Sequence, residues 1–356
     1  MGTLDLLGGG PLDRLAQARQ AALDAGALAT AATVSLQMAA WFTNRAEPER
    51  ALDAGRSCAV EAGRLRLPLV EGLGLILQAV AHALMDRQSE MEAAIEKAVT
   101  VSGGHPEVHG VAALMARTLL WVVREDRVRA RGELDTGMEL LRGTAVTAPN
   151  RGLWALVHTL DGSDGEAAVI EVEASGLTVY WLIRGWVGHA RAVILGRQGR
   201  AAEAEEAFAR ADTDLVPSDW YRHHARRLVA EAAIVDSWGD PQRWLADALA
   251  FFDSAGPPAV ASACRSLLRR AGAPVPRRRR PAPDLAAPLA AAKVTPREAE
   301  VLALLAEGRS TKEIAARLYL SPKTVERHIA NLAAKVGVEG RSELVAFAAS
   351  HRVGAT

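Results

Sequence analysis

The sequence predicts an all-α protein, in which an array of helical hairpins is followed by a compact unit of four short helices. Three observations lead to this prediction. Residues 1–272 are rich in Ala, poor in Pro and almost without the apolar–polar alternation of a half-buried strand. Turn-forming residues recur in that region every 36 to 41 positions. Residues 294–345 contain short apolar stripes at helical spacing, each preceded by a residue that caps helices.

The composition is that of an ordinary globular protein. The 356 residues include 42 basic and 42 acidic side chains, and the length suggests about two domains. Cys58 and Cys264 have no CxxC partner, which excludes a disulfide framework and a thiolate zinc site. Met1 to Leu7 carry no basic residue before a short apolar run, so we expect no secretory signal and a cytoplasmic protein.

One uncharged segment is long enough to raise the question of a membrane span. Ala25 to Asn44 contains no charged residue, but it holds six polar side chains, and most of the rest is Ala and Gly. A buried, Ala-packed helix is the better interpretation. The shorter uncharged run Gly72 to Met85 predicts a second core helix, and no transmembrane segment is expected.

The spacing of the turns indicates a repeated helical hairpin. The candidate turns are Glu47-Pro48, Arg87-Gln88, Glu125-Asp126, Gly162-Ser163, Gln198-Gly199 and Gly239-Asp240. This is the period of a helical-hairpin solenoid. The clearest unit has a Gly-containing turn at Leu195 to Arg200, followed by a stripe of Ala204, Ala207, Phe208 and Ala211. It resembles the tetratricopeptide-repeat hairpin. The other units match loosely, and we expect an irregular central part around Leu177 to Ala190.

A linker is predicted at residues 273–292, between an N-terminal domain at 1–272 and a C-terminal domain at 293–356. Five prolines fall within residues 273–288, too many for a helix or a central strand. The run Arg277 to Arg280 could add phosphate contacts, and a solubilising tether is an equally good interpretation.

Capping signals define the four C-terminal helices. Thr295-Pro296-Arg297-Glu298 and Ser310-Thr311-Lys312-Glu313 are capping boxes, and Ser321-Pro322 supplies a third N-cap with Pro at the first helical position. Gly308 and Gly337 are expected to end the first and third helices, and Ser342 to open the fourth. The third helix carries the apolar stripe Val325, Ile329, Leu332 and Val336.

Two short helices joined by about three residues, with a supporting helix before them, match the helix-turn-helix arrangement. The third helix would then enter a DNA groove. Its outer face presents Lys323, Thr324, Arg327, Ala330, Asn331 and Lys335. Arg and Asn can pair with purine edges, whereas Lys suits phosphate, and Lys312 could lie against the backbone on one flank. Residues 293–356 carry a net charge of +3 and four of the five lysines, which favours a polyanionic partner.

The segment Val294 to Val345 reads VTPREAEVLALLAEGRSTKEIAARLYLSPKTVERHIANLAAKVGVEGRSELV and resembles the LuxR-type DNA-binding domain. The resemblance implies that Lys312, Thr324 and Lys335 meet the DNA backbone. It further implies that Glu326, Arg327, Ala330 and Asn331 approach base edges, and that the fourth helix pairs two copies on a two-fold DNA site. The sequence departs from the family at Thr311, where Asn is frequent, and at Glu326, where many members have Lys.

The combination of array, linker and terminal module resembles the C-terminal half of the large LuxR regulators of high-GC bacteria. Those proteins carry an upstream ATP-binding domain, but no GxxxxGK[ST] motif occurs here, and Gly8-Gly9-Gly10 leads into Pro11. We therefore expect a double-stranded-DNA-binding transcription regulator that needs no cofactor and takes a protein or small-molecule effector at its array. The alternative is a protein-interaction scaffold whose helix-turn-helix no longer binds DNA specifically, an interpretation to which Glu326 points.

Signals for an enzyme are weak. Neither a GxSxG elbow nor an HExxH helix occurs. His105 and His109 predict a helix start with surface histidines, because no third metal ligand is evident. His223 and His224 lie beside Tyr221, Arg222, Arg226 and Arg227, either as a site for an anionic ligand or, the favoured interpretation, as a solvated helix face. Most of the eight Trp are expected in the core.

Overall fold

The computed structural model describes residues 11–144, 146–162, 164–275, 289, 292, 294–318 and 321–350. Within these residues every regular element is a helix, so the all-α prediction is confirmed. The chain divides into two compact units, Met1–Val275 and Pro276–Thr356, which are described separately below. Gly8 to Gly10, Arg277 to Arg280 and most of the predicted linker lie outside the described residues.

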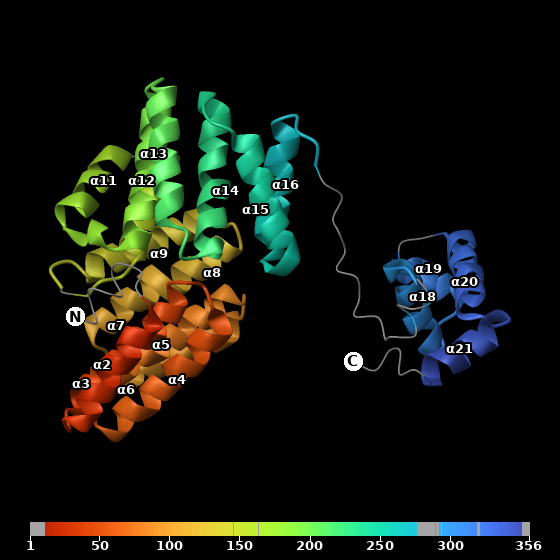
Figure 1. The fold of residues 1–356 in the computed structure, drawn as a ribbon, viewed down its shortest axis with the longest axis horizontal. Helices are drawn as coiled ribbons and strands as arrows, with labels where there is room; N and C mark the ends of the chain where they lie inside the picture. The colour runs from red at the N-terminus through yellow and green to blue at the C-terminus, as the bar shows by residue number, and fades with distance from the viewer. Residues whose placement is uncertain are drawn as a thin grey trace. The chain divides into compact units, whose positions relative to one another are not determined.

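The N-terminal unit is an array of helices, most of which pack against the next helix along the chain. Its first part comprises α2 (Leu12–Asp24), α3 (Leu28–Thr43), α4 (Pro48–Arg64), α5 (Pro68–Leu84), α6 (Gln88–Val101), α7 (Pro106–Val111), the π-helical segment η1 (Ala112–Arg117), α8 (Thr118–Val123) and α9 (Arg127–Leu140). The helices from α2 to α6 pack each against the next and form one group of neighbours in Figure 1. His105 caps α7 through its side chain, so the predicted helix start is confirmed.

The second part of the array follows the segment 141–149, in which none of the described residues belongs to a helix. It comprises α10 (Asn150–Asp161), α11 (Gly165–Ala174), the 3₁₀ turn η2 (Leu177–Val179), α12 (Trp181–Arg197), α13 (Ala201–Asp214), α14 (Asp219–Asp236), α15 (Pro241–Ala255) and α16 (Pro258–Arg270). These helices stand beside one another in Figure 1, with α12 against α13 and α14 against α15. A helical hairpin array is therefore the architecture of this unit.

One hydrogen-bonded turn recurs along the first part of the array. At the end of α3 the amide of Ala46 donates to Thr43 O (3.0 Å) and the amide of Glu47 donates to Phe42 O (3.1 Å). Ala46, Arg66 and Asp86 take left-handed backbone conformations at an interval of twenty residues, with φ of 54°, 55° and 57°. This pair of bonds satisfies carbonyls that the helix end leaves free. The predicted turns at 125–126, 198–199 and 239–240 lie between helices, and those at 47–48 and 87–88 lie where α4 and α6 begin. Ser163 of the sixth predicted turn is not described.

Small residues and large aromatics together fill the core. The Ala-packed helix predicted at 25–44 is α3, in which Ala31, Ala32 and Ala39 are fully buried. The stripe Ala204, Ala207, Phe208 and Ala211 is buried on α13, as expected. Trp181, Trp186, Trp220 and Trp238 are buried, which confirms that these tryptophans belong to the core. Both cysteine thiols are buried as well, and burial raises their pKa to about 12.

The two parts of the array are held together by contacts over long stretches of sequence. Ser218 Oγ donates to Arg45 O at 3.0 Å, and the Tyr221 hydroxyl donates to Thr43 O at 3.3 Å. Arg227 on α14 pairs with Glu125 in the α8–α9 turn. Helix α14 therefore joins the end of the array to the first hairpins, and residues 11–275 act as one body.

Two sequence interpretations are wrong for this unit. The expected irregular part at Leu177 to Ala190 is confined to the turn η2, because α12 is regular from Trp181 onward. Its glycines do not break it but allow close packing, since a Cβ at Gly188 would lie 2.8 Å from Ala211 Cβ.

The prediction of a solvated helix face at His223 and His224 is also wrong, because His224 is 1% exposed and Tyr221 is fully buried. The neighbouring arginines are not available to an anion. Arg222 and Arg226 both bind Asp212 of α13, at 2.6 Å in each case. The acidic partners come from other helices, which the local sequence could not show.

The C-terminal unit contains α18 (Pro296–Ala306), α19 (Thr311–Leu318), α20 (Pro322–Val336) and α21 (Gly340–Ser350). The fourth helix begins at Gly340 and not at the predicted Ser342. The amide of Glu339 donates to Glu343 Oε2 at 2.6 Å, a capping bond that starts the helix earlier. In the part of the chain that is described, no helix is long and apolar enough to cross a membrane.

Two glycines of α9 make a matched test of close packing. A Cβ at Gly137 would lie 2.6 Å from Leu114 Cβ and 2.7 Å from Leu114 N, whereas a Cβ at Gly132 meets nothing within 4 Å. We expect Gly137→Ala to lower the free energy of unfolding by about 1–3 kcal/mol, since backbone atoms must move. Gly132→Ala should raise it by about 0.5–1 kcal/mol, because Ala is the better helix former.

Chemical denaturation of the full chain, followed by the circular dichroism of its helices, measures both changes. Equal effects of the two substitutions would contradict the close approach of α9 to η1.

Candidate nucleic-acid interface

Local capping bonds set the start of each of the first three C-terminal helices. For α18 the amide of Thr295 donates to Glu298 Oε2 (2.8 Å), and the amide of Glu298 donates to Thr295 Oγ1 (3.3 Å). Ser310 and Glu313 make the same reciprocal pair before α19, at 2.7 and 3.3 Å. The amide of Thr324 donates to Ser321 Oγ at 3.1 Å to start α20. All three predicted caps are confirmed.

The turn between α18 and α19 is held from two sides. Gly308 takes φ +76°, which a glycine adopts without strain, and its amide donates to Leu305 O at 3.0 Å. Arg341, at the start of α21, donates to Thr311 Oγ1 at 3.3 Å and to the carbonyl oxygen of Arg309. Thr311 therefore lies in a contact that fixes α19 to α21. Tyr319 and Leu320, predicted to connect α19 to α20, lie outside the described residues.

A small apolar core fixes the rotation of α20 about its axis. Val325 and Leu332 are fully buried among Leu302, Ile314 and Leu344. Ile329 and Val336, the remaining members of the predicted stripe, pack against this core while partly buried. Successive helical residues are rotated by about 100°, so the opposite side of α20 must face outward.

The outward side of α20 carries the residues singled out in the sequence. Lys323, Glu326, Arg327, Ala330, Asn331 and Lys335 are exposed, and Thr324 is half-buried. The Thr324 hydroxyl lies 2.8 Å from Ser321 Oγ, within hydrogen-bond distance. Lys312 is exposed in the first turn of α19. The structure thus brings the α20 candidates onto one continuous surface and leaves Lys312 on the neighbouring helix.

Lys335 has a partner that the sequence analysis missed. Its Nζ lies 2.6 Å from Glu298 Oε2, and the Glu298 residue is only 4% exposed. Burial tends to raise the pKa of Glu298, but hydrogen bonds from Lys335 and from Thr295 outweigh it and lower that pKa overall. The carboxylate that caps α18 therefore also anchors the last turn of α20. No local signal in the sequence marks this partner, because the burial of Glu298 and its closeness to Lys335 depend on how α18 and α20 pack.

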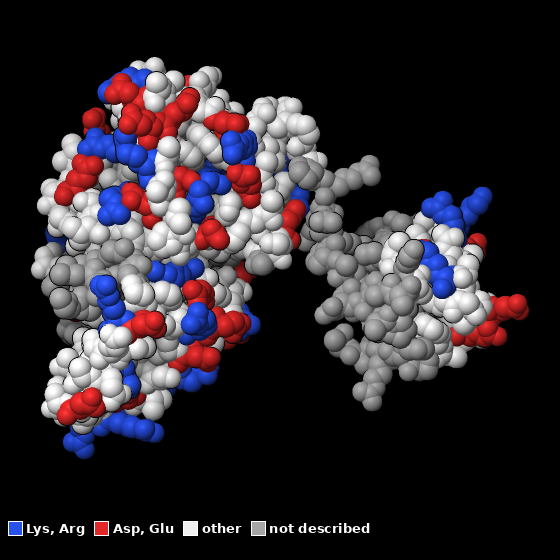
Figure 2. All heavy atoms as spheres, in the orientation of Figure 1, with Lys and Arg blue, Asp and Glu red and all other residues white. Residues whose placement is uncertain are grey.

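Charges are distributed differently on the two units. In Figure 2, basic and acidic side chains are interspersed over the visible face of the N-terminal unit, but gather in separate groups on the visible face of the C-terminal unit.

Within α19, Glu313 accepts hydrogen bonds from the amide and hydroxyl of Ser310, and these bonds lower its pKa. This carboxylate is thereby committed to capping α19.

Comparison with known proteins assigns this unit. The family model of bacterial regulatory proteins, luxR family, matches residues 292–348. The spore germination protein GerE of Bacillus subtilis (strain 168) is 52% identical over 52 residues, which are 15% of this chain and 70% of GerE. The chain belongs to the luxR family of bacterial regulatory proteins. Its C-terminal unit is a LuxR-type DNA-binding transcriptional regulator domain.

Other LuxR-type relatives share the same small part of the chain. The transcriptional regulatory protein UhpA of Salmonella typhimurium is 52% identical over 65 residues, 17% of this chain and 33% of UhpA. The putative HTH-type transcriptional regulator Mb0914c of Mycobacterium bovis is 46% identical over 56 residues, 16% of this chain and 6% of Mb0914c. None of these relatives is named as an enzyme. No solved structure matches the chain, and the family model covers no residue before 292.

The Lys335–Glu298 pair predicts a structural role for Lys335, which lies on the outward side of α20. Lys335→Ala removes the cation from a buried carboxylate, so we expect the C-terminal unit to lose about 1–2 kcal/mol of stability. Amide hydrogen exchange of α18 and α20 in the full chain measures this loss. Lys323→Ala, a change at an exposed lysine of the same helix, is the control and should leave the exchange rates unchanged.

The stability that the Lys335–Glu298 pair contributes should also depend on pH. Because the pKa of Glu298 is lowered in the folded state, the stabilisation is present above the ordinary Glu value of 4.5 and is lost as the pH falls through the folded-state pKa. The difference between the wild type and Lys335→Ala should therefore shrink in acid. A difference that stays constant with pH would argue against the ion pair.

Proposed function

We propose that the protein is a sequence-specific, DNA-binding transcription regulator of the LuxR family, regulated through its helical N-terminal array. The observation that carries this proposal is the outward surface of α20. Arg327 and Asn331 are exposed there, on the side opposite the buried Val325 and Leu332. A helix rotated in this way can enter a major groove with its polar side toward the bases.

The chemistry of the exposed side chains suggests which of them contact bases and which contact phosphates. Arg327 and Asn331 can each make paired hydrogen bonds to a purine, Glu326 can accept from cytosine N4, and Ala330 can pack against a thymine methyl group. Lys312 and Lys323 suit phosphate as point charges, and the half-buried Thr324 hydroxyl can reach the backbone. Lys335 can contact the DNA backbone only if a phosphate competes with Glu298 for its ammonium group.

The N-terminal unit supports the proposed organisation of the chain. Residues 1–272 would form a tetratricopeptide-like sensor or interaction domain, residues 273–292 a linker, and residues 293–356 the DNA-binding domain. The regular hairpins and the buried Ala204, Ala207 and Phe208 favour this likeness. Helix α21, in which Val345 and Phe347 are half-buried, would pair two copies on DNA. An effector, either a protein or a small molecule, would act at the array inside the cytoplasm.

The competing proposal is a protein-interaction scaffold that has lost specific DNA binding. The observation behind it is the exposed carboxylate of Glu326 on the surface that would face DNA. Selection of bound duplexes from a random DNA library by the full-length protein separates the two. An enriched, roughly palindromic motif supports the regulator, and no enrichment supports the scaffold.

Arg327 and Lys323 make a matched pair for testing the roles on α20. Arg327→Ala should cost about 1–3 kcal/mol and relax specificity at one base pair, because a paired contact to a base edge is lost. Lys323→Ala should weaken binding to all sequences alike and reduce the salt dependence by about one released counterion. Equilibrium titrations on the selected site and on single-base variants of it measure both.

The assignment of Arg327 would be wrong if Arg327→Ala weakened every duplex equally. Hydrogen exchange of α20 in both variants serves as the control that the domain remains folded.

A further inference from the structure

The first turn of α19 carries Lys312, which is suited to a contact with DNA phosphate. Lys312 is exposed, and it lies two positions before the buried Ile314, about 200° away around the helix. Helix α19 spans eight residues, which is too short for stability on its own, and helix ends are the first part to fray. The position of Lys312 therefore depends on what holds the first turn of α19 in place.

Contacts within α19 do not attach that turn to the rest of the domain. The capping bonds between Ser310 and Glu313 join neighbours in the sequence, so they start the helix without fixing it to another one. The buried Ile314 and Ala315 pack into the core of the four helices, but they follow the first residue of α19 by three and four positions. An attachment at the first turn has to come from a neighbouring element.

Arg341 of α21 supplies such an attachment. Its Nη1 donates to Thr311 Oγ1 at 3.3 Å, and its Nη2 donates to the carbonyl oxygen of Arg309. The two acceptors flank Ser310, the residue that caps α19. A guanidinium group presents its donors in a fixed planar fork, so one side chain holds the turn and the start of the helix together.

The rest of α21 anchors Arg341 itself. Leu344 and Ala348 are fully buried in the small apolar core, and Arg341 lies three residues before Leu344, on the same side of the helix. The capping bond from the Glu339 amide to Glu343 Oε2 orders the first turn of α21. Arg341 therefore extends from an anchored helix to the start of α19.

We propose that Arg341 is a positioning residue for DNA binding, which holds the first turn of α19 so that Lys312 meets a phosphate of the DNA backbone. A cation that is already held in place loses less conformational freedom on binding, so the affinity rises without a further contact. Arg341 acts through Lys312 and not by contacting DNA itself. The inference rests on the proposed function above, and in particular on the phosphate contact of Lys312.

A double-mutant cycle on DNA affinity tests this coupling in the full chain. Arg341→Ala should weaken binding to the selected duplex about three- to tenfold, a difference of about 0.7–1.4 kcal/mol. In the Lys312→Ala background the same change should weaken binding by less than about 1.5-fold, because the group that Arg341 positions is gone. Lys323→Ala is the control background, since Lys323 belongs to α20, and Arg341→Ala should keep its full effect there. A loss of domain stability would act alike in both backgrounds.

Further variants separate positioning from direct contact with DNA. Arg341→Lys keeps the charge but loses the fork, so it should bind as weakly as Arg341→Ala. Thr311→Val removes one of the two acceptors and leaves every charge in place, so it should reproduce part of the loss. Thr311→Ser keeps the hydroxyl and should restore binding. Amide hydrogen exchange of α18 and α20 checks that each variant is folded.

Equal effects of Arg341→Ala in the Lys312→Ala and Lys323→Ala backgrounds overturn the inference and leave the proposed function intact. Wild-type affinity of Arg341→Lys, or of Lys312→Ala, overturns it as well. If the wild type binds no duplex, the proposed function fails and this inference fails with it. If Arg341→Ala does not fold, Thr311→Val and Thr311→Ser in the same two backgrounds decide.

Discussion

The burial of Val325 and Leu332 is the constraint on which the LuxR-type domain depends. These two side chains lock α20 against α18, α19 and α21 and so fix which residues of α20 face outward. The ion pair between Lys335 and Glu298 adds a polar anchor at the last turn of the same helix, 37 residues from its partner in sequence. A slip of one residue in α20 would move Glu326 into the place of the buried Val325 and so bury a charge. The polar surface is therefore a consequence of a few apolar contacts.

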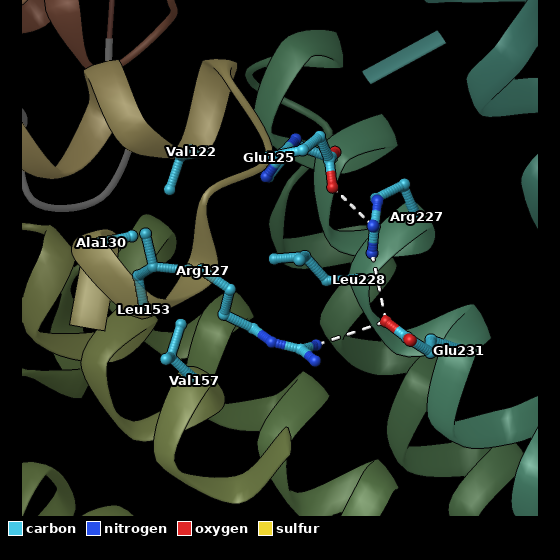
Figure 3. A pocket seen from close by; sticks show the side chains of 10 residues that line it. Val122, Glu125, Arg127, Ala130, Leu153, Val157, Arg227, Leu228 and Glu231 are labelled. Atoms are coloured by element: carbon cyan, nitrogen blue, oxygen red, sulfur yellow. Dashed lines mark hydrogen bonds and ion pairs between the residues drawn. The ribbon is translucent and has the colours of Figure 1, made fainter. Parts of the chain in front are cut away.

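The N-terminal array follows a different principle, in which small residues and a repeated turn set the spacing of the helices. Close approach at Gly137 and Gly188 removes the room that a side chain would need, while the left-handed residues at the turns reverse the chain. Such packing leaves few gaps. A cavity beside Arg227, seen in Figure 3, is a departure from it, and it occurs where charged side chains of the α8–α9 turn, α9 and α14 lie next to the apolar core that the two parts of the array share.

Charged residues were the least reliable guide in the sequence. Arg222 and Arg226 suggested a solvated face or an anion site, but both are bound to Asp212 on the preceding helix. Lys335 suggested a phosphate contact, but its ammonium group also serves Glu298. In each case the type of residue was informative about its charge and not about its partner, because an ion pair between helices depends on how those helices pack.

The sequence by itself determined the helices of the C-terminal domain and the caps that start the first three, because a capping bond joins residues only three apart and is decided locally. It also determined the all-α class and half of the turns of the array. It missed turns such as the one at Arg66, where an ordinary residue takes the left-handed conformation that usually signals Gly. Only the tertiary structure decided that Lys335 pairs with Glu298 and that Glu125, Arg227 and His224 border one cavity. These groups lie far apart along the chain, and no local pattern fixes the distance between them until the helices that carry them have packed.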